Sequence, residues 1–130
     1  MILGMGMDLV DAGRIARVEE RRGERFLQRV FTAHEEEAAG SGPHRHRRLA
    51  ARMAAKEAFL KALGTGLRDG RWVEMEVVND AMGKPELHLS GRLATRAAGL
   101  GVTLIHLSLT HEVDYAAACV ILTGTEGGRR

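Results

Sequence analysis

The sequence predicts an α+β fold, a single domain in which an antiparallel sheet packs against one long, alanine-rich helix. The chain has 130 residues, which is the length of one ordinary domain. Apolar residues recur at helical spacing in some segments and alternate with polar residues in others, so both helices and half-buried strands are expected. With 45% apolar and 28% charged residues, the composition also excludes disorder of the whole chain.

Before residue 44 the pattern predicts one short strand and three helices. Asp11 is of a type that caps helix N-termini, and Gly23 is expected to end or bend the helix that Asp11 opens. Thr32 and Glu35 have the Thr-x-x-Glu spacing of a capping box. The expected elements are a strand at 2–7 that ends at Asp8, a helix at about 12–22, a short helix that holds Phe26, Leu27 and Val30, a helix opened by Thr32, and a loop at 40–43.

After residue 44 the pattern predicts the long helix, two strand pairs and a last helix. The segment 45–63 lacks Gly and Pro and is rich in Ala, and Gly64 is a natural residue to follow its end. The expected elements are a helix at 45–63, strands at 72–77 and 85–89 around a turn at 79–84, a helix capped by Ser90 that runs to about Leu100, and strands at 102–109 and 115–123 joined at 110–114. Residues 1–123 form the expected domain, and the tail 124–130 is expected to be disordered.

Composition excludes several classes of protein. No apolar run reaches the roughly 18 residues that span a bilayer, and the first residues do not form a secretory signal, so a cytoplasmic protein without a membrane partner is expected. The lone Cys119 cannot form an internal disulfide or a multi-cysteine metal site. Aromatic residues, at 4%, are too few for a platform that stacks nucleic-acid bases.

Two acidic residues have unusual surroundings. Asp8 follows an apolar, Gly-rich segment, and Glu57 lies in the Ala-rich helix beside Phe59 and Leu60. A carboxylate in such surroundings needs a partner. Mg²⁺ suits two carboxylates without a His or Cys cluster, because water and substrate phosphates complete its coordination. A second helix cap for Asp8 and an ion pair of Glu57 with Lys61 remain as alternatives.

Basic residues of the long helix lead to a glycine loop. Lys61 shares a helix face with Glu57, and Lys56 shares a face with Arg52. Each of these two pairs forms a charged row along the helix, and both rows are expected to run toward Gly64-Thr65-Gly66. The backbone amides of that loop favour an anion such as a diphosphate. The negative end of the helix dipole opposes an anion there, so a purely structural cap remains an alternative.

Arginine dominates the basic residues, with 16 of the 19 Lys and Arg residues. One group would form a single stripe if its helix continued through Gly23; its members are Arg14, Arg17, Arg21 and Arg25. An acidic helical partner fits such a stripe, and a solvated face is the alternative. With the basic segment 44–48, the stripe also suggests a nucleic-acid-binding module without catalysis, but that interpretation leaves Asp8 and Glu57 unexplained.

His111 follows Ser108, Leu109 and Thr110 in a segment that is expected to end a strand at a turn. A Ser/His hydrolase is disfavoured, because Ser108 is not on a strand-to-helix elbow with flanking glycines. His111 as a phosphate ligand and His111 as a simple turn residue both remain open.

Several segments together resemble one family in order and spacing. They are Gly-Met-Gly-Met-Asp at 4–8, the stretch 52–66 with its Lys-Glu-Ala-x-x-Lys-Ala core, Gly-Lys-Pro at 83–85, and the segments 108–111 and 115–118. The family is the holo-[acyl-carrier-protein] synthases, small bacterial 4′-phosphopantetheinyl transferases, and the resemblance covers about residues 2–122. It implies the fold of that family and a step of fatty acid biosynthesis. In this step 4′-phosphopantetheine moves from coenzyme A to a serine hydroxyl of apo acyl carrier protein, with Mg²⁺ required and adenosine 3′,5′-bisphosphate released.

The resemblance also implies site roles and an assembly. Asp8 and Glu57 match metal ligands, which favours the magnesium interpretation, and with Lys61 they are the expected catalytic residues. The residues that match contacts to the coenzyme are Arg52, Lys61, Gly64, Thr65, Gly66 and His111. Those that match the helix docking the carrier protein are Arg14, Arg21 and Arg25. The family implies a homotrimer with active sites between protomers, and Glu112 departs from the small hydroxyl residue that many members have.

The expected chemistry is electrostatic. Mg²⁺ on Asp8 and Glu57, together with Lys61, is expected to stabilise the leaving bisphosphate. The proton of the serine hydroxyl is expected to pass to Glu57 or to a metal-bound water that Glu57 orients. Whether fatty-acid or polyketide carrier proteins are modified stays open.

Overall fold

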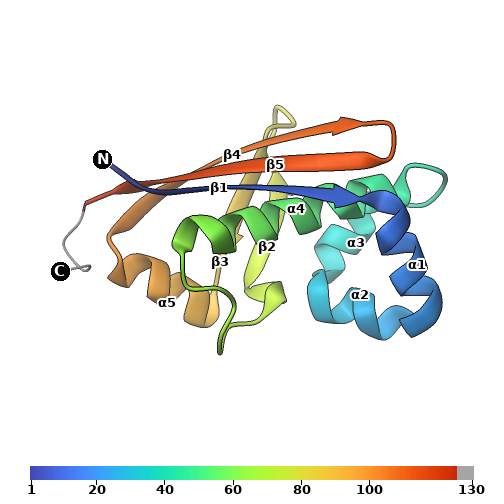
Figure 1. Ribbon diagram of the computed structural model, residues 1–130, viewed down its shortest axis with the longest axis horizontal. Coiled ribbons are helices and arrows are strands. Elements are labelled where there is room, and N and C mark those ends of the chain that lie inside the picture. The colour runs from blue at the N-terminus through green and yellow to red at the C-terminus, as the bar shows by residue number, and fades with distance from the viewer. Residues whose placement is uncertain (126–130) are drawn as a thin grey trace.

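A three-stranded antiparallel sheet lies along the long helix α4, with a strand hairpin and short helices around them (Figure 1). The computed structural model describes residues 1–125. The elements are β1 (Ile2–Asp11), α1 (Ala12–Arg22), α2 (Glu24–Val30), α3 (Ala33–Ala39), α4 (Arg45–Leu63), a 3₁₀ turn (Trp72–Glu74), β2 (Met75–Asn79), β3 (Pro85–Leu89), α5 (Gly91–Gly99), β4 (Val102–Glu112) and β5 (Tyr115–Gly124). The α+β class, with an antiparallel sheet on an alanine-rich helix, is confirmed.

The three-stranded sheet has the order β1-β5-β4, so β1 and β4 form its two edges. Side chains alternate between the faces of a strand. On β1 the side chains of Met5, Met7 and Leu9 are 62%, 65% and 63% exposed, whereas Gly6 and Val10 are buried. One face of β1 therefore packs on the protein and the other presents a row of large apolar side chains.

Two glycines let β1 approach α4 closely. A Cβ at Gly4 would overlap the carbonyl oxygen of Ala62, and one at Gly6 would overlap that of Ala58. Gly6 and Asp8 are two residues apart and therefore lie on the same face of the strand. The glycines bring the backbone of β1 against α4 and so place the carboxylate of Asp8 beside that helix.

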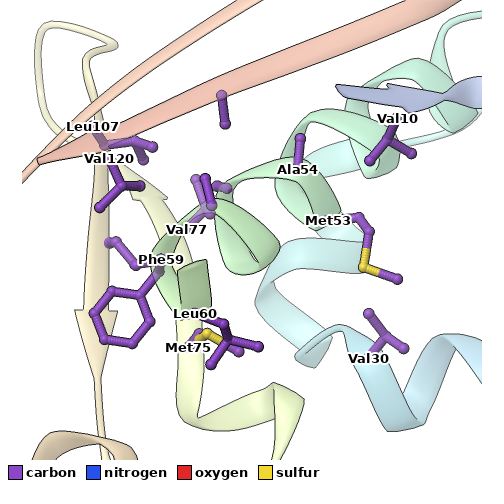
Figure 2. Close-up of a cluster of buried hydrophobic side chains, with 14 of the residues drawn as sticks. Val10, Val30, Met53, Ala54, Phe59, Leu60, Met75, Val77, Leu107 and Val120 are labelled. Atoms are coloured by element: carbon purple, nitrogen blue, oxygen red, sulfur yellow. The ribbon is translucent and has the colours of Figure 1, made fainter. Parts of the chain in front are cut away.

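The core surrounds α4 on most of its circumference. The side chain of Phe59 is fully buried, and Figure 2 shows it among apolar side chains of the sheet and of β2, including Val77 and Val120. Alanines such as Ala54 and Ala58 are also fully buried and let neighbouring elements approach. The helix has the predicted bounds, 45–63.

Most of the predicted helix caps are confirmed, and the one at Ser90 is wrong. Asp11 caps α1 by accepting from the amide of Gly13, and Thr32 and Glu35 form the predicted capping box of α3. Gly64 closes α4 in a left-handed conformation, with φ of 81°. Ser90, however, makes no side-chain capping bond to α5.

The carboxylate of Glu74 takes the place of the Ser90 cap. It accepts from the amide of Leu93 near the start of α5. Glu74 belongs to the 3₁₀ turn over 72–74, so the strand expected from residue 72 begins only at Met75. The expected hairpin of β2 with β3 is confirmed, with Val77 opposite Leu87.

The outer strands are longer than predicted. β1 continues to Asp11, which pairs with Tyr115 of β5, so Asp8 lies inside the strand and not at its end. β4 continues to Glu112, and the ladder with β5 is closed by a turn at 113–114. His111 is therefore a strand residue, because cross-strand pairing continues beyond the expected turn.

The expectation that Lys56 carries a surface charge is wrong. Lys56 was expected to form a charged row with Arg52 toward the glycine loop, but its side chain is 0% exposed. Its Nζ donates to Glu35 Oε1 and to the carbonyl oxygen of Val30, each at 2.6 Å. The helix face that carries Lys56 is covered by the segment around α3, so the charge is neutralised inside the core.

Two further expectations concern the ends of helices and of the chain. α1 ends at Gly23, which has φ of 70°, so the stripe of arginines is interrupted and Arg25 belongs to α2. The tail was expected to be disordered from residue 124, but β5 includes Gly124 and the amide of Thr125 donates to the carbonyl oxygen of Gly101. The rest of the predicted tail, from residue 126, lies outside the described residues. No helix within residues 1–125 is long and apolar enough to cross a membrane, and the cytoplasmic location stays a prediction.

Candidate functional site

Asp8 and Glu57, the two carboxylates singled out in the sequence, meet between β1 and α4. The two carboxyl groups are close enough for Asp8 to act on Glu57 both as a hydrogen-bond partner, when one of the groups is protonated, and as a like charge. Burial, then the hydrogen bond with Asp8 and the charge of Asp8, raises the pKa of Glu57 to about 7, against the opposing charges of Arg14 and Lys61. A proton or a cation is thus required to hold the two groups together at low energy cost.

Lys61 completes this cluster. Its Nζ donates to Asp8 Oδ1 at 2.9 Å and to the carbonyl oxygen of Met7 at 3.1 Å. The alternative ion pair of Lys61 with Glu57 is therefore replaced by one with Asp8, whose hydrogen bond raises the pKa of Lys61. The Lys61 side chain is 59% exposed, so its ammonium group also faces solvent and any anion that binds there.

The Asp8–Glu57 pair fits a magnesium ion. While Glu57 is ionised, Asp8 Oδ2 is buried without a hydrogen-bond donor among the described residues, which is a costly state unless a proton or a cation lies between the two carboxylates. The donors are carboxylate oxygens, the type that Mg²⁺ prefers. No third acidic, His or Cys side chain within residues 1–125 joins them. Since Mg²⁺ commonly binds one or two carboxylates plus waters and phosphate oxygens, two protein ligands suffice.

The loop after α4 lies directly beyond Lys61. Gly64 and Gly66 have φ of 81° and 70°, and nothing lies within 4 Å of the position where either would carry a Cβ. Thr65 is half-buried and accepts a hydrogen bond from Arg96 of α5. Sequence reasoning missed Arg96, because one arginine in a short amphipathic helix carries no motif.

Arg52 and His111 lie in a different place. Both line a pocket of about 440 Å³ that β4, α4 and the β2–β3 hairpin form, together with Arg47, Arg48, Ala51, Val77, Asn79, Gly83, Pro85 and Leu109. None of Asp8, Glu57 and Lys61 lines it. Asp8 is on the β1 edge of the sheet and His111 on the β4 edge. The expected coenzyme contacts therefore form two separate half-sites within one chain.

Arg52 is nearly buried and incompletely paired. Its side chain donates to the carbonyl oxygen of Arg48 at 3.1 Å, but its Nε is buried without a partner among the described residues. Burial lowers the pKa of Arg52, while the charge of Glu35 acts in the opposite direction. An anion in the pocket would satisfy this guanidinium.

The arginines expected to dock a partner are all exposed. Arg14 and Arg21 lie on α1, and Arg25 lies on α2. Arg14 is close enough to Glu57 for its charge to act on that carboxyl group. Arg25 lines a pocket of about 720 Å³ with Arg29, Arg71 and Trp72. The basic surface thus begins beside the carboxylate pair.

Comparison with known proteins shows the family to which the chain belongs. The family model for the 4′-phosphopantetheinyl transferase superfamily matches residues 4–120. The chain is 45% identical over 123 residues to the holo-[acyl-carrier-protein] synthase of Geobacter metallireducens, with 94% of this chain and 98% of the relative covered. It is 48% identical over 124 residues to that of Edwardsiella ictaluri, with 95% and 98% covered.

Solved structures show the same fold. The holo-[acyl-carrier-protein] synthase of Neisseria meningitidis superposes with a TM-score of 0.86 at 34% identity, over 95% of this chain and 99% of that one. That of Bacillus anthracis, solved in complex with CoA (3′,5′-ADP), gives a TM-score of 0.78 at 33% identity, over 96% and 99%. The chain therefore belongs to the 4′-phosphopantetheinyl transferase superfamily and, within it, to the holo-[acyl-carrier-protein] synthases, which are transferases.

Proposed function

We propose that the chain transfers 4′-phosphopantetheine from coenzyme A to a serine hydroxyl of an apo acyl carrier protein and releases adenosine 3′,5′-bisphosphate in a magnesium-dependent reaction. The observation that carries this proposal is the contact between Asp8 and Glu57, with Asp8 Oδ2 buried and unpaired. Family membership and the coenzyme A complex of a relative support the substrate pair.

Asp8 and Glu57 hold the metal in this proposal, and Lys61 binds the diphosphate of the coenzyme. A bound magnesium ion would supply electrostatic stabilisation of the charge that grows on the diphosphate oxygens. Lys61 is anchored by Asp8 and by the carbonyl oxygen of Met7, which keeps one ammonium hydrogen directed at the substrate without further ordering. Phosphoryl transfer depends mainly on such positioning and charge.

Glu57 is the proposed acceptor of the serine proton, directly or through a water molecule that it orients. Without a bound cation the pKa of Glu57 is about 7. A cation on the carboxylate pair would favour the ionised form of Glu57, so the form that accepts a proton is populated near neutral pH. The carboxyl group is half-buried at the boundary with solvent, where an incoming hydroxyl reaches it.

Arg14, Arg21 and Arg25 are proposed to dock the carrier protein. All three are exposed on neighbouring helices that follow β1, and Arg14 lies nearest to Glu57. An acidic helical partner held by these residues would present its serine beside the carboxylate pair.

The active form is proposed to be a homotrimer with active sites between protomers. The carboxylate half-site lies on the β1 edge, and the Arg52–His111 pocket lies by the β4 edge. The exposed apolar row of Met5, Met7 and Leu9 favours burial against another copy. Joining the edge of one copy to the opposite edge of the next would unite both half-sites.

Transfer is tested by incubating the protein with coenzyme A, Mg²⁺ and an apo acyl carrier protein. The carrier should gain the mass of one phosphopantetheine, and adenosine 3′,5′-bisphosphate should be released in equal amount. A chelator should abolish the reaction and added Mg²⁺ should restore it. Carrier binding without any mass gain would instead indicate a non-catalytic binding protein.

The docking surface is tested by reversing charge. Arg14→Glu with Arg21→Glu should raise the KM for the carrier protein at least about tenfold, because two favourable charge contacts become repulsive. The KM for coenzyme A in the same preparation is the internal control and should stay within about twofold. An equal rise of both KM values would contradict a docking role.

The shared active site is tested by mixing two inactive variants. Asp8→Asn removes the carboxylate half-site, and His111→Ala alters the other half-site. If sites form between protomers, mixed trimers contain some sites with both halves intact, so the mixture should regain activity that neither variant has alone. A mixture that exchanges subunits and stays inactive would contradict shared sites, and light scattering should give the mass of three chains.

A further inference from the structure

Arg96 of α5 holds the loop that follows α4. Its Nη1 donates to Thr65 Oγ1 at 3.0 Å and to the carbonyl oxygen of Gly66 at 2.8 Å. Its Nη2 donates to the carbonyl oxygen of Leu67 at 3.3 Å and to Asp69 Oδ1 at 2.8 Å. One planar guanidinium thus contacts four residues of the loop on both sides of Arg68, and Figure 1 shows the segment after α4 beside α5.

The loop has few other restraints. After the bond from Gly64 to Leu60 that closes the helix, the backbone bond within the loop is the one from the Gly70 amide to the Leu67 carbonyl oxygen, at 2.8 Å. Arg68 has φ of 48°, an uncommon conformation for a residue other than glycine. Such a conformation persists only where the surroundings enforce it. Arg96 bonds to the loop on both sides of Arg68, while Leu67 packs against the core and Arg92 pairs with Asp69.

The direction of these bonds decides where the amides of the loop point. In a trans peptide the carbonyl and the following amide point in opposite directions. The carbonyls of Gly66 and Leu67 are turned toward Arg96, so the amides of Leu67 and Arg68 are turned away from it. Among the described residues, neither amide donates to a protein acceptor. Successive free amides of this kind form a concave binding surface for anions.

Arg96 itself is poorly placed to bind substrate. Its side chain is only 17% exposed, and both terminal nitrogens already have two acceptors each. Asp69, 60% exposed, opposes its charge and also pairs with Arg92. An anion at the loop would therefore meet backbone amides and not this guanidinium.

We propose that Arg96 is a positioning residue that fixes the loop 65–69 in the conformation that receives the diphosphate of coenzyme A. The inference rests on the proposed function, and it predicts a selective effect on that substrate. Removing the contacts lets the loop sample other conformations, so ordering it becomes part of the cost of binding the coenzyme.

The kinetic test compares two arginines of the same helix. Arg96→Ala should raise the KM for coenzyme A about tenfold, while the KM for the carrier protein stays within about twofold. Arg92→Ala is the matched control, because Arg92 is 70% exposed and its side-chain hydrogen bond within residues 1–125 is to Asp69. Its KM values should stay within about twofold of wild type. Equal effects of the two variants, or equal rises of both KM values in Arg96→Ala, would overturn the inference.

A conservative variant distinguishes the hydrogen-bonding geometry of the Arg96 guanidinium from its positive charge. Arg96→Lys keeps the positive charge but cannot reach four acceptors with one ammonium group. Its KM for coenzyme A should resemble that of Arg96→Ala. A value within about twofold of wild type would show that charge alone suffices and would overturn the positioning role.

A second measurement does not depend on turnover. Arg68 is exposed within the loop, so trypsin can cleave after it once the loop opens. Cleavage there, followed by mass spectrometry, should be at least about fivefold faster in Arg96→Ala than in Arg92→Ala, since local opening governs proteolysis. Equal rates would overturn the inference even if wild type transfers phosphopantetheine. A wild-type protein without transferase activity would refute the proposed function and leave the cleavage result to decide the role of Arg96.

Discussion

Lys56 and Glu57 are neighbours in the chain, but their charged groups have opposite surroundings. Lys56 is buried, and its ammonium group is matched by the carboxylate of Glu35 at 2.6 Å. The partner carboxylate is itself saturated, because Glu35 also accepts from the amides of Thr32 and Val77. Glu57, one residue later and turned to another face of α4, meets a second carboxylate instead of a cation.

This difference distinguishes a charged pair that only supports the fold from a pair that is proposed to bind a ligand. Lys56 and Glu35 are each other's partner of opposite sign, so this pair joins α3 and α4, and the amide of Val77 ties β2 to the same carboxylate. Around Asp8 a carboxylate oxygen is buried without a partner, and the like charge of Glu57 raises the local energy. An incomplete pair of this kind supports the proposal that the site binds a cation.

The largest expected effect is on catalysis. Glu57→Gln and Asp8→Asn should each lower kcat/KM on the order of 10²- to 10³-fold, because each removes charge from the proposed metal site. Stability should be kept or increased, since one of two repelling carboxylates is gone. Steady-state kinetics and thermal unfolding of the same samples check both parts. Near-wild-type, magnesium-dependent transfer in either variant would refute the metal site.

The next effect is on stability. Lys56→Met leaves Glu35 charged in the core without its cation, and the free energy of unfolding should fall by about 3–5 kcal/mol. Lys61→Met is the matched control on the same helix, and its stability should stay close to that of wild type, because Lys61 is largely exposed. Urea unfolding measures both variants. Similar losses would show that the two lysines do not differ as proposed.

A smaller effect concerns the contact of β1 with α4. In Gly6→Ala the new Cβ meets the carbonyl oxygen of Ala58, which should cost about 1–3 kcal/mol and displace Asp8 from Glu57. Activity should therefore fall further than the loss of folded protein explains. Gly99→Ala, with open space at the Cβ position, is the control and should retain wild-type activity. Unchanged activity in folded Gly6→Ala would show that close approach is not needed.

The smallest effect is on the pH dependence of stability without metal. Because the pKa of Glu57 is raised from 4.5 to about 7 in the folded state, its bound proton stabilises the fold fully below pH 4.5. That contribution disappears as the pH rises through 7. The Tm of the chelated protein should fall more between pH 5 and pH 8 in wild type than in Glu57→Gln. Added Mg²⁺ should raise the Tm at pH 8 in wild type only. Parallel profiles of the two proteins would contradict the raised pKa.

Much of the fold follows from local patterns. The bounds of α4, the capping box at Thr32 and the left-handed Gly64 depend on residues within a few positions of one another, so periodicity and capping preferences predict them. The extents of β1 and β4 were underestimated, because a strand continues as long as its neighbour offers backbone partners. Those partners lie on β5, more than a hundred residues from β1 in the chain.

Local patterns predicted only part of the candidate site. Asp8 and Glu57 attracted attention because carboxylates are costly in apolar surroundings. The sequence did not reveal that Lys56 belongs to the core, that Arg52 and His111 line a separate pocket, or that Arg96 holds the loop. Each of these facts depends on which distant segment covers a given side chain.

The sequence by itself determined the elements, the helix ends and the acidic residues that lacked local partners, since these depend on interactions between near neighbours. Only the tertiary structure decided which charges are neutralised. Glu35 is 21 residues from Lys56 and Asp8 is 53 residues from Lys61 in the chain, and helical spacing does not predict contacts between residues so far apart. Compensation of a buried charge is a property of packing, and it distinguishes the completed pair in the core from the incomplete pair in the site.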